Sequence, residues 1–112
     1  MPNESEPLDR VFQSLSNPTR RAVVARLGQG SATMTGLAAQ FDMALPSFLQ
    51  HLDVLESAGL VSSEKVGRTR TYRLEPRFLV EAEHWLEAHR RQWDTRLSQL
   101  DDLLLSRKEN NK

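Results

Sequence analysis

The sequence predicts a mainly α-helical fold with one small β-hairpin. Apolar residues recur at helical spacing up to residue 58, and they do so again after Pro76. Between these patterns, residues 61–74 are rich in β-branched and aromatic residues around Gly67, which is typical of two strands and a tight turn. The 112 residues have room for one domain with a modest core, so some apolar surface is expected to be covered by a partner chain.

The first helix is predicted over residues 8–15. Four apolar residues there follow the spacing i, i+3, i+4, i+7 and form one stripe, which consists of Leu8, Val11, Phe12 and Leu15. The stripe is wide for so short a helix, and we expect Leu8, Val11 and Phe12 to lie in a dimer interface. Residues 1–7 are polar and hold two prolines, which predicts a disordered tail.

A second helix is predicted from Pro18 to the glycine at position 28. Asn17 can cap its first turn, where the fixed φ of Pro18 is also favourable. The outer side of this helix carries three basic residues, Arg20, Arg21 and Arg26. A solvated helix face accounts for such a row, although Arg20 or Arg21 is also able to contact a phosphate.

Two further helices joined by a short turn are predicted over residues 33–41 and 45–58. The loop that precedes them lacks a phosphate-binding glycine pattern, and Thr33 or Thr35 is expected to cap the first of the two. Pro46 suits the first turn of the second helix, because its missing N–H has no partner there anyway. This arrangement predicts a helix-turn-helix, whose second helix can enter the major groove of DNA.

The second of these helices has an apolar and a polar side. Its core-facing residues recur at i, i+4, i+7, and they are Phe48, Leu52 and Leu55. Its outer side is left with Ser47, Gln50, His51, Asp53 and Val54. Of these, Ser47, Gln50 and His51 form the polar set that we expect to contact DNA bases. Gln50 suits adenine, whereas Leu45 and Leu49 can contact only thymine methyl groups, so an A·T-leaning DNA site is expected.

The hairpin that follows turns the helix-turn-helix into a winged helix. Strands are predicted over residues 61–65 and 68–74 with a turn at Val66-Gly67, and Tyr72 and Leu74 point inward. Five basic and two acidic residues between positions 61 and 77 give a local charge of 5 − 2 = +3. The alternative explanation is that these charges only keep an exposed edge strand soluble and prevent its aggregation. A basic hairpin beside a candidate recognition helix nevertheless favours contact with DNA phosphates. We expect Lys65, Arg68 and Arg70 to contact DNA.

The last helix is predicted over residues 77–106, uninterrupted by glycine or proline. Its apolar positions step by three and four residues, close to a coiled-coil seam: Ala82, Leu86, His89, Trp93, Leu97, Leu100 and Leu104. A lone helix cannot bury this stripe, so we expect it to pack on the first helix and on its copy in a second subunit. Residues 8–76 then form the DNA-binding domain, 77–106 the dimerisation helix and 107–112 a polar tail.

Several motifs follow one another in the order and spacing of a known family. They are Asn17–Arg21, Leu37-Ala38, Met43 with Pro46, His51–Val61 and Gly67–Leu74. Together they resemble the ArsR-type (ArsR/SmtB-like) winged helix-turn-helix repressors, over roughly residues 8–105. The resemblance implies a homodimeric bacterial transcriptional regulator that binds double-stranded DNA at a pseudo-palindromic operator.

The chain departs from this family at two places. The positions matching Ala44, Leu45 and Leu49 commonly carry a capping serine, a glutamine and a second serine, and here all three are apolar. Many relatives bind metals through cysteines, or through an aspartate, two histidines and a glutamate on the last helix. This chain has no cysteine, and Thr95 stands where a second histidine would follow His84. We therefore expect no metal effector and no cofactor. The sequence does not indicate which other effector, if any, the protein binds.

Other functions are disfavoured. Glu81 and His84 share a helix face and are one alternative metal site, yet a long charged helix produces such pairs by chance. No catalytic set is evident, so an enzyme is not expected. The absence of a signal peptide and of a membrane-length apolar stretch predicts a cytoplasmic protein without a membrane partner. The net charge of zero gives no global attraction to DNA, so any DNA binding must rest on a locally positive face. The remaining rival is a winged helix that binds another protein through apolar residues such as Leu45 and Leu49.

Overall fold

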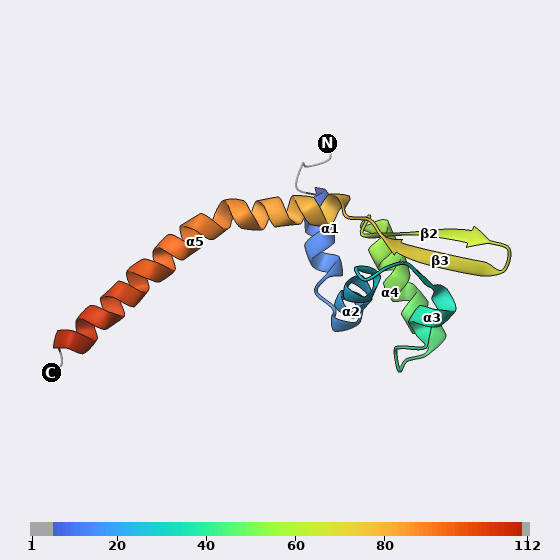
Figure 1. The fold of residues 1–112 in the computed structure, drawn as a ribbon, viewed down its shortest axis with the longest axis horizontal. Coiled ribbons are helices and arrows are strands. Elements are labelled where there is room, and N and C mark those ends of the chain that lie inside the picture. Colours follow the sequence, from blue (N-terminus) through green and yellow to red (C-terminus); the bar gives the residue numbers. More distant parts are fainter. Residues whose placement is uncertain (1–5, 111–112) are drawn as a thin grey trace. The chain divides into compact units, whose positions relative to one another are not determined.

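The computed structural model describes residues 6–110 and contains the predicted helices together with a small sheet (Figure 1). The elements in chain order are α1 (Glu6–Ser14), α2 (Pro18–Leu27), β1 (Ala32–Thr33), α3 (Met34–Ala38), α4 (Leu45–Ser57), β2 (Val61–Val66), β3 (Thr69–Leu74) and α5 (Arg77–Asn110). The chain divides into two compact units, one ending at Ala82 and one beginning at Glu83. The winged helix-turn-helix lies in the first unit.

Both terminal helices are longer than predicted. Residues 6–7 belong to α1 rather than to a tail, because a glutamate and a proline are both favourable in a first helical turn. Residues 107–110 belong to α5, whose last turn carries Arg107 and Lys108 at the negative end of the helix dipole. The rest of the two predicted tails, residues 1–5 and 111–112, lies outside the described residues.

Side-chain caps fix the starts of α2 and α3. The Asn17 side chain accepts hydrogen bonds from the backbone N–H groups of Thr19 and Arg20, at 2.9 and 3.1 Å. The Thr33 hydroxyl accepts from the Gly36 N–H at 3.0 Å, so Thr33 is the cap of α3. Both caps satisfy donors that a helix leaves open at its first turn.

The sheet has three strands in the order β1-β3-β2, one more than the predicted hairpin. Strand β1 pairs Ala32 with Tyr72 and Thr33 with Thr71. The sequence could not indicate it, because two residues are too few to show an alternating pattern. The turn between β2 and β3 is formed by Gly67 and Arg68, one residue later than predicted, since Val66 still pairs with Thr69.

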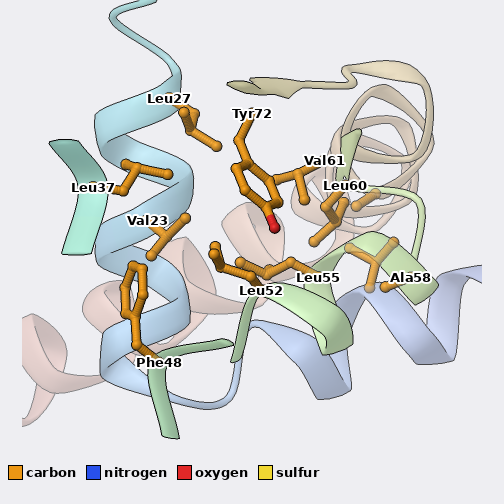
Figure 2. Close-up of a cluster of buried hydrophobic side chains, with 12 residues drawn as sticks. Val23, Leu27, Leu37, Phe48, Leu52, Leu55, Ala58, Leu60, Val61 and Tyr72 are labelled. Carbon is orange, nitrogen blue, oxygen red and sulfur yellow. The ribbon is translucent and has the colours of Figure 1, made fainter. Parts of the chain in front are cut away.

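The core of the first unit lies between α2, α4 and the sheet. Figure 2 shows Val23 and Leu27 of α2 facing Leu52 and Leu55 of α4, with the ring of Tyr72 between them. The predicted inward residues Phe48, Leu52, Leu55 and Tyr72 are all buried. Val11 is 0% exposed and belongs to this core, so it packs within the protomer and cannot be the interface residue that we predicted.

Gly59 ends α4 and lets the start of α5 approach it. Its φ of 77° lies in the left-handed region that favours glycine. A Cβ atom at this position would lie 2.6 Å from two ring carbons of Phe78, a residue of the first turn of α5. Ala82, one turn further along α5, is buried in the same core. The first six residues of α5 are therefore part of the winged-helix unit.

Candidate nucleic-acid interface

Helix α4 exposes a short polar face at its N-terminal half. Ser47 and Gln50 are exposed, as predicted, and Leu45 is 46% exposed beside them. Ala44 occupies the N-cap position without a side-chain hydrogen bond, which fits the substitution of alanine for a capping residue. Leu49 differs from our prediction of an outward apolar residue, because it is half-buried and packed against the core. Of the α4 residues predicted to contact DNA, those with exposed side chains are therefore Leu45, Ser47 and Gln50.

The β2–β3 hairpin forms the wing and projects from the helices (Figure 1). Gly67 has a φ of 63°, which allows the two-residue turn and places Arg68 at the tip. Lys65 and Arg70 are direct cross-strand partners, so their side chains lie on the same side of the sheet. Neither residue forms an ion pair among the described residues, and Arg68 is likewise unpaired there. The tip of the wing thus carries three uncompensated cations.

The other two basic residues of the wing region are engaged within the protein. Arg73 forms an ion pair with Glu75 at 3.1 Å and also donates to the Ser62 hydroxyl at 3.0 Å. The hydrogen bonds from Ser62 and then Arg73 hold the pKa of the Glu75 carboxyl below its usual range. Arg77 lies over the ring of Phe78, with the guanidinium carbon 5.2 Å from the ring centroid. The wing beyond these two residues therefore keeps Lys65, Arg68 and Arg70 against Glu64, a formal charge of 3 − 1 = +2.

A groove of about 700 Å³, here called the wing groove, runs between α4 and the wing. Its basic residues are Lys65, Arg68 and Arg70, its acidic residues are Asp53 and Glu56, and its remaining walls are Thr33, Met34, Thr35, Leu49, Thr69 and Tyr72. The formal charge of this lining is 3 − 2 = +1. Burial raises the pKa of Tyr72, and the nearby Glu56 carboxylate adds to that effect. The groove is therefore polar, open and only weakly positive.

One acid of the wing groove is linked to a wing cation. The Ser63 hydroxyl donates to Glu56 Oε1 at 2.7 Å and accepts from Arg70 Nη1 at 2.8 Å. This chain of hydrogen bonds joins α4 to both strands of the hairpin. It fixes the direction of the Arg70 guanidinium without neutralising it by direct contact. Sequence patterns did not indicate this link, because its three residues lie in different elements.

The arginines of α2 have structural partners, which the sequence interpretation missed. Arg20 Nε donates to the Ser14 carbonyl at 2.6 Å, and Arg21 Nη1 donates to the Leu15 carbonyl at 2.8 Å. Arg26 Nη1 donates to the Gly30 carbonyl at 3.1 Å. These bonds satisfy carbonyls at the end of α1 and in the loops that follow α1 and α2. Arg20 Nη1 also lies 3.2 Å from Nδ1 of the half-buried His51 on α4.

The predicted dimer surfaces have different degrees of exposure. In the first unit Leu8 is half-buried and Phe12 is 38% exposed. In the second unit the seam positions are largely exposed along a single helix, and they are Leu86, Trp93, Leu97, Leu100 and Leu104. His89 is half-buried between Trp85 and Trp93, with its ring stacked on Trp85 at 4.2 Å between centroids.

The described part of the chain holds neither a metal-binding cluster nor a membrane-spanning helix. No group of three or more His, Asp or Glu side chains gathers there in a way that could hold a metal ion, and the pair Glu81 and His84 gains no third ligand. Within the same residues, no helix combines the length and apolar character needed to cross a bilayer.

Comparisons with known proteins agree with this geometry. A family model described as a helix-turn-helix domain matches residues 15–64. The HTH-type transcriptional regulator Rv2034 of Mycobacterium tuberculosis is 41% identical over 68 residues, which are 61% of this chain and 64% of that protein. The transcriptional repressor SdpR of Bacillus subtilis is 30% identical over 79 residues, which are 70% of this chain and 88% of that protein.

A solved structure supports the same assignment over a longer stretch. It is described as the ArsR family transcriptional regulator RHA00566 and is 44% identical, with a TM-score of 0.76. The match covers 84% of this chain and 97% of that one. The expectation of a regulator rather than an enzyme is confirmed by these relatives. The chain therefore belongs to the ArsR family of winged helix-turn-helix transcriptional regulators.

Proposed function

We propose that this regulator is a homodimeric repressor that binds a two-fold symmetric DNA operator without a metal effector. Helix α4 would enter the major groove in each half-site, and the wing would contact the adjacent phosphates or minor groove. The observation that carries the proposal is the pairing of an exposed polar face on α4 with three unpaired cations at the wing tip. The repressor named SdpR among the relatives supports the direction of regulation.

The charge pattern of the wing favours an anionic partner. Lys65 and Arg70 stand directly opposite each other across the ladder, an arrangement that destabilises a hairpin by like-charge repulsion. A phosphate between or beside them would relieve that repulsion. The chain as a whole has no net charge, so attraction to DNA must come from this local surface.

Base contacts would come from the N-terminal half of α4. Gln50 has the geometry to bond N6 and N7 of adenine, and Leu45 offers apolar contact to a thymine methyl group. Leu49 is half-buried and would contribute to the shape of the helix surface more than to direct contact. We propose an A·T-leaning operator with modest base discrimination and a larger share of readout through DNA shape.

Dimerisation would use the half-buried Leu8 and the exposed Phe12 of α1 together with the seam of α5. Large apolar side chains spaced by three and four residues along α5 remain open to solvent in one protomer. A second copy would cover them by pairing along the seam. Two recognition helices related by a two-fold axis would then contact half-sites about 34–36 Å apart.

Binding to genomic fragments tests the proposal. The purified protein is mixed with fragmented DNA of its source organism, and bound fragments are recovered and sequenced. We expect enrichment of an inverted repeat, and we expect calorimetric titration with divalent metals to give no tight site that changes operator affinity. Bound fragments without a shared inverted repeat would contradict the proposed two-fold symmetric operator. A tight metal site that changes operator affinity would contradict the proposal that no metal effector exists.

The rival function is a winged helix that binds a protein partner through Leu45 and the apolar recess beside it. That recess is lined by Met34, Thr35, Ala38, Ala39 and Leu45. Gln50→Ala distinguishes the two functions. Under the DNA proposal it lowers operator affinity and relaxes base preference at one position, by about 1–3 kcal/mol for a bidentate contact. If Gln50→Ala and Leu45→Ser both leave DNA binding unchanged, α4 does not contact bases.

A further inference from the structure

The guanidinium of Arg20 connects the recognition helix to the end of α1. Its Nε donates to the Ser14 carbonyl at 2.6 Å, and its Nη2 donates to the Gln13 carbonyl at 3.4 Å. The remaining nitrogen, Nη1, lies 3.2 Å from Nδ1 of His51. Three contacts from one planar group leave Arg20 little freedom. The His51 ring therefore contacts a guanidinium whose position is fixed by the carbonyls at the end of α1.

This contact determines which ring nitrogen of His51 carries the proton. A guanidinium has N–H donors and no acceptor, so Nδ1 of His51 must be the unprotonated, accepting nitrogen. In a neutral imidazole the proton is then on Nε2. A proton on Nδ1 would place two donors against each other at 3.2 Å.

The opposite nitrogen of the ring has no protein partner. Among the described residues, no hydrogen bond or ion pair involves Nε2 of His51. No buried side-chain nitrogen or oxygen of the described residues lacks a partner, so this unpartnered atom is open to solvent. His51 therefore presents a single, fixed N–H donor on the surface of α4. Because His51 is half-buried beside α2, this donor lies on the flank of α4, one turn after Ser47 and at the edge of the exposed face that carries Gln50.

We propose that Arg20 is a positioning residue that holds His51 as the Nε2–H tautomer, and that this N–H donates to a DNA phosphate oxygen. The inference rests on the proposed function, since it needs α4 to lie in the major groove. The flank of a helix in that groove faces the sugar-phosphate backbone, whereas its outermost face meets the bases. The contact gives His51 a role that is independent of base sequence.

Two amide substitutions separate the two nitrogens of the ring. His51→Asn keeps an acceptor near the position of Nδ1, toward Arg20, and removes the outer donor. His51→Gln extends an amide N–H₂ to about the position of Nε2 and so keeps the outer donor. We expect His51→Gln to bind the operator within about threefold of the wild type, and His51→Asn to bind roughly tenfold to a hundredfold more weakly, the loss of one hydrogen bond to a charged group. Because the lost donor is neutral, the slope of log affinity against log salt concentration should not change.

If His51→Asn bound the operator more tightly than His51→Gln, the role of His51 would be purely structural. If His51→Asn binds like the wild type, the outer donor contacts nothing and the proposal fails. A change of preference at one base pair in His51→Asn would also overturn it, because the contact would then be to a base edge. Thermal unfolding of both variants shows whether either has lost its fold. If the wild type binds no duplex DNA, the proposed function itself fails, and the phosphate contact fails with it.

The tautomer is tested without DNA. Nitrogen chemical shifts of the His51 ring in the free protein should show a proton on Nε2 and none on Nδ1. Arg20→Met removes the donor that selects this form, so it should give a mixture of tautomers and the same sequence-independent loss of affinity. A wild-type ring protonated on Nδ1, or an unchanged tautomer in Arg20→Met, would refute the positioning role of Arg20.

Discussion

Individual residues show that a pattern can be correct while the role of its members is different. The row Arg20, Arg21 and Arg26 was interpreted as a solvated helix face, but each guanidinium bonds a backbone carbonyl. The stripe position Val11 was assigned to a partner chain and is fully buried in the protomer. Spacing predicts which residues share a face of a helix. It cannot predict which neighbour covers that face, because the neighbour lies elsewhere in the sequence.

Gly59 provides a prediction about stability. Replacing it with alanine imposes a left-handed φ on a residue with a Cβ and places that atom 2.6 Å from the Phe78 ring. We expect Gly59→Ala to lower the free energy of unfolding by about 2–4 kcal/mol. Gly67→Ala is the matched control, because Gly67 also has a positive φ but its Cβ would meet open space. Urea unfolding measures the free energy of unfolding of both variants. Equal losses of this free energy would show that the Phe78 ring can move aside without cost.

Tyr72 provides a prediction about pH. Burial, then the Glu56 carboxylate, raises its pKa above the ordinary value of 10.0, so folding favours the neutral phenol. The associated stability is fully present below the ordinary pKa and is lost as the pH rises through the raised pKa of the folded state. Tyr72 is the chain's single tyrosine, so phenolate absorbance reports it directly. We expect this titration above pH 10 and a flatter alkaline stability profile for Tyr72→Phe. A phenolate that forms at or below the ordinary value in the folded protein would contradict this.

At the scale of elements, the sequence predicted the order of helices and the hairpin, and it missed what depends on pairing over a distance. Helices α2 and α4 were predictable because each has a first-turn proline and a glycine after its end, and α4 also has an apolar period. Strand β1 was not, because it exists only through its pairing with Tyr72 and Thr71 of β3. The wing groove depends on the same tertiary arrangement. Its cations were visible in the sequence, but the acids Asp53 and Glu56 that face them were not recognised as part of it.

The wing provides a prediction about salt dependence. Arg68→Ala removes an unpaired cation at the tip, and it should weaken binding to all duplex sequences while reducing the salt slope by about one unit. Arg73→Ala is the matched control in the same hairpin, because Arg73 is already occupied by Glu75 and Ser62. Its salt slope should stay near that of the wild type. Operator and scrambled duplexes are titrated at several salt concentrations. A change of preferred sequence in Arg68→Ala, with an unchanged slope, would show that Arg68 contacts bases.

For the whole molecule, the division into two units separates the elements proposed to contact DNA from those proposed to hold the dimer. The first unit has its own core and ends at Ala82, whereas the second is a stretch of α5 whose large apolar side chains are exposed. A helix with such a stripe needs a partner, since exposed apolar patches of this extent mark interaction sites. Because an operator with two half-sites must be bound by both subunits at once, loss of the dimer should abolish tight operator binding without unfolding the winged helix.

Leu97→Glu tests this separation. Leu97 is 58% exposed on the seam of α5, and a dimer would bury it, so a glutamate there would place an unpaired charge in an apolar interface at a cost of several kcal/mol. Sedimentation should give a dimer for the wild type and a monomer for Leu97→Glu, with the helical signal of the folded unit retained in both. Ser98→Glu adds the same charge one residue along, off the seam, and should leave the dimer intact. A wild type that sediments as a monomer at micromolar concentration would refute the dimer. A monomeric Leu97→Glu that keeps full operator affinity would show instead that one winged helix suffices for binding.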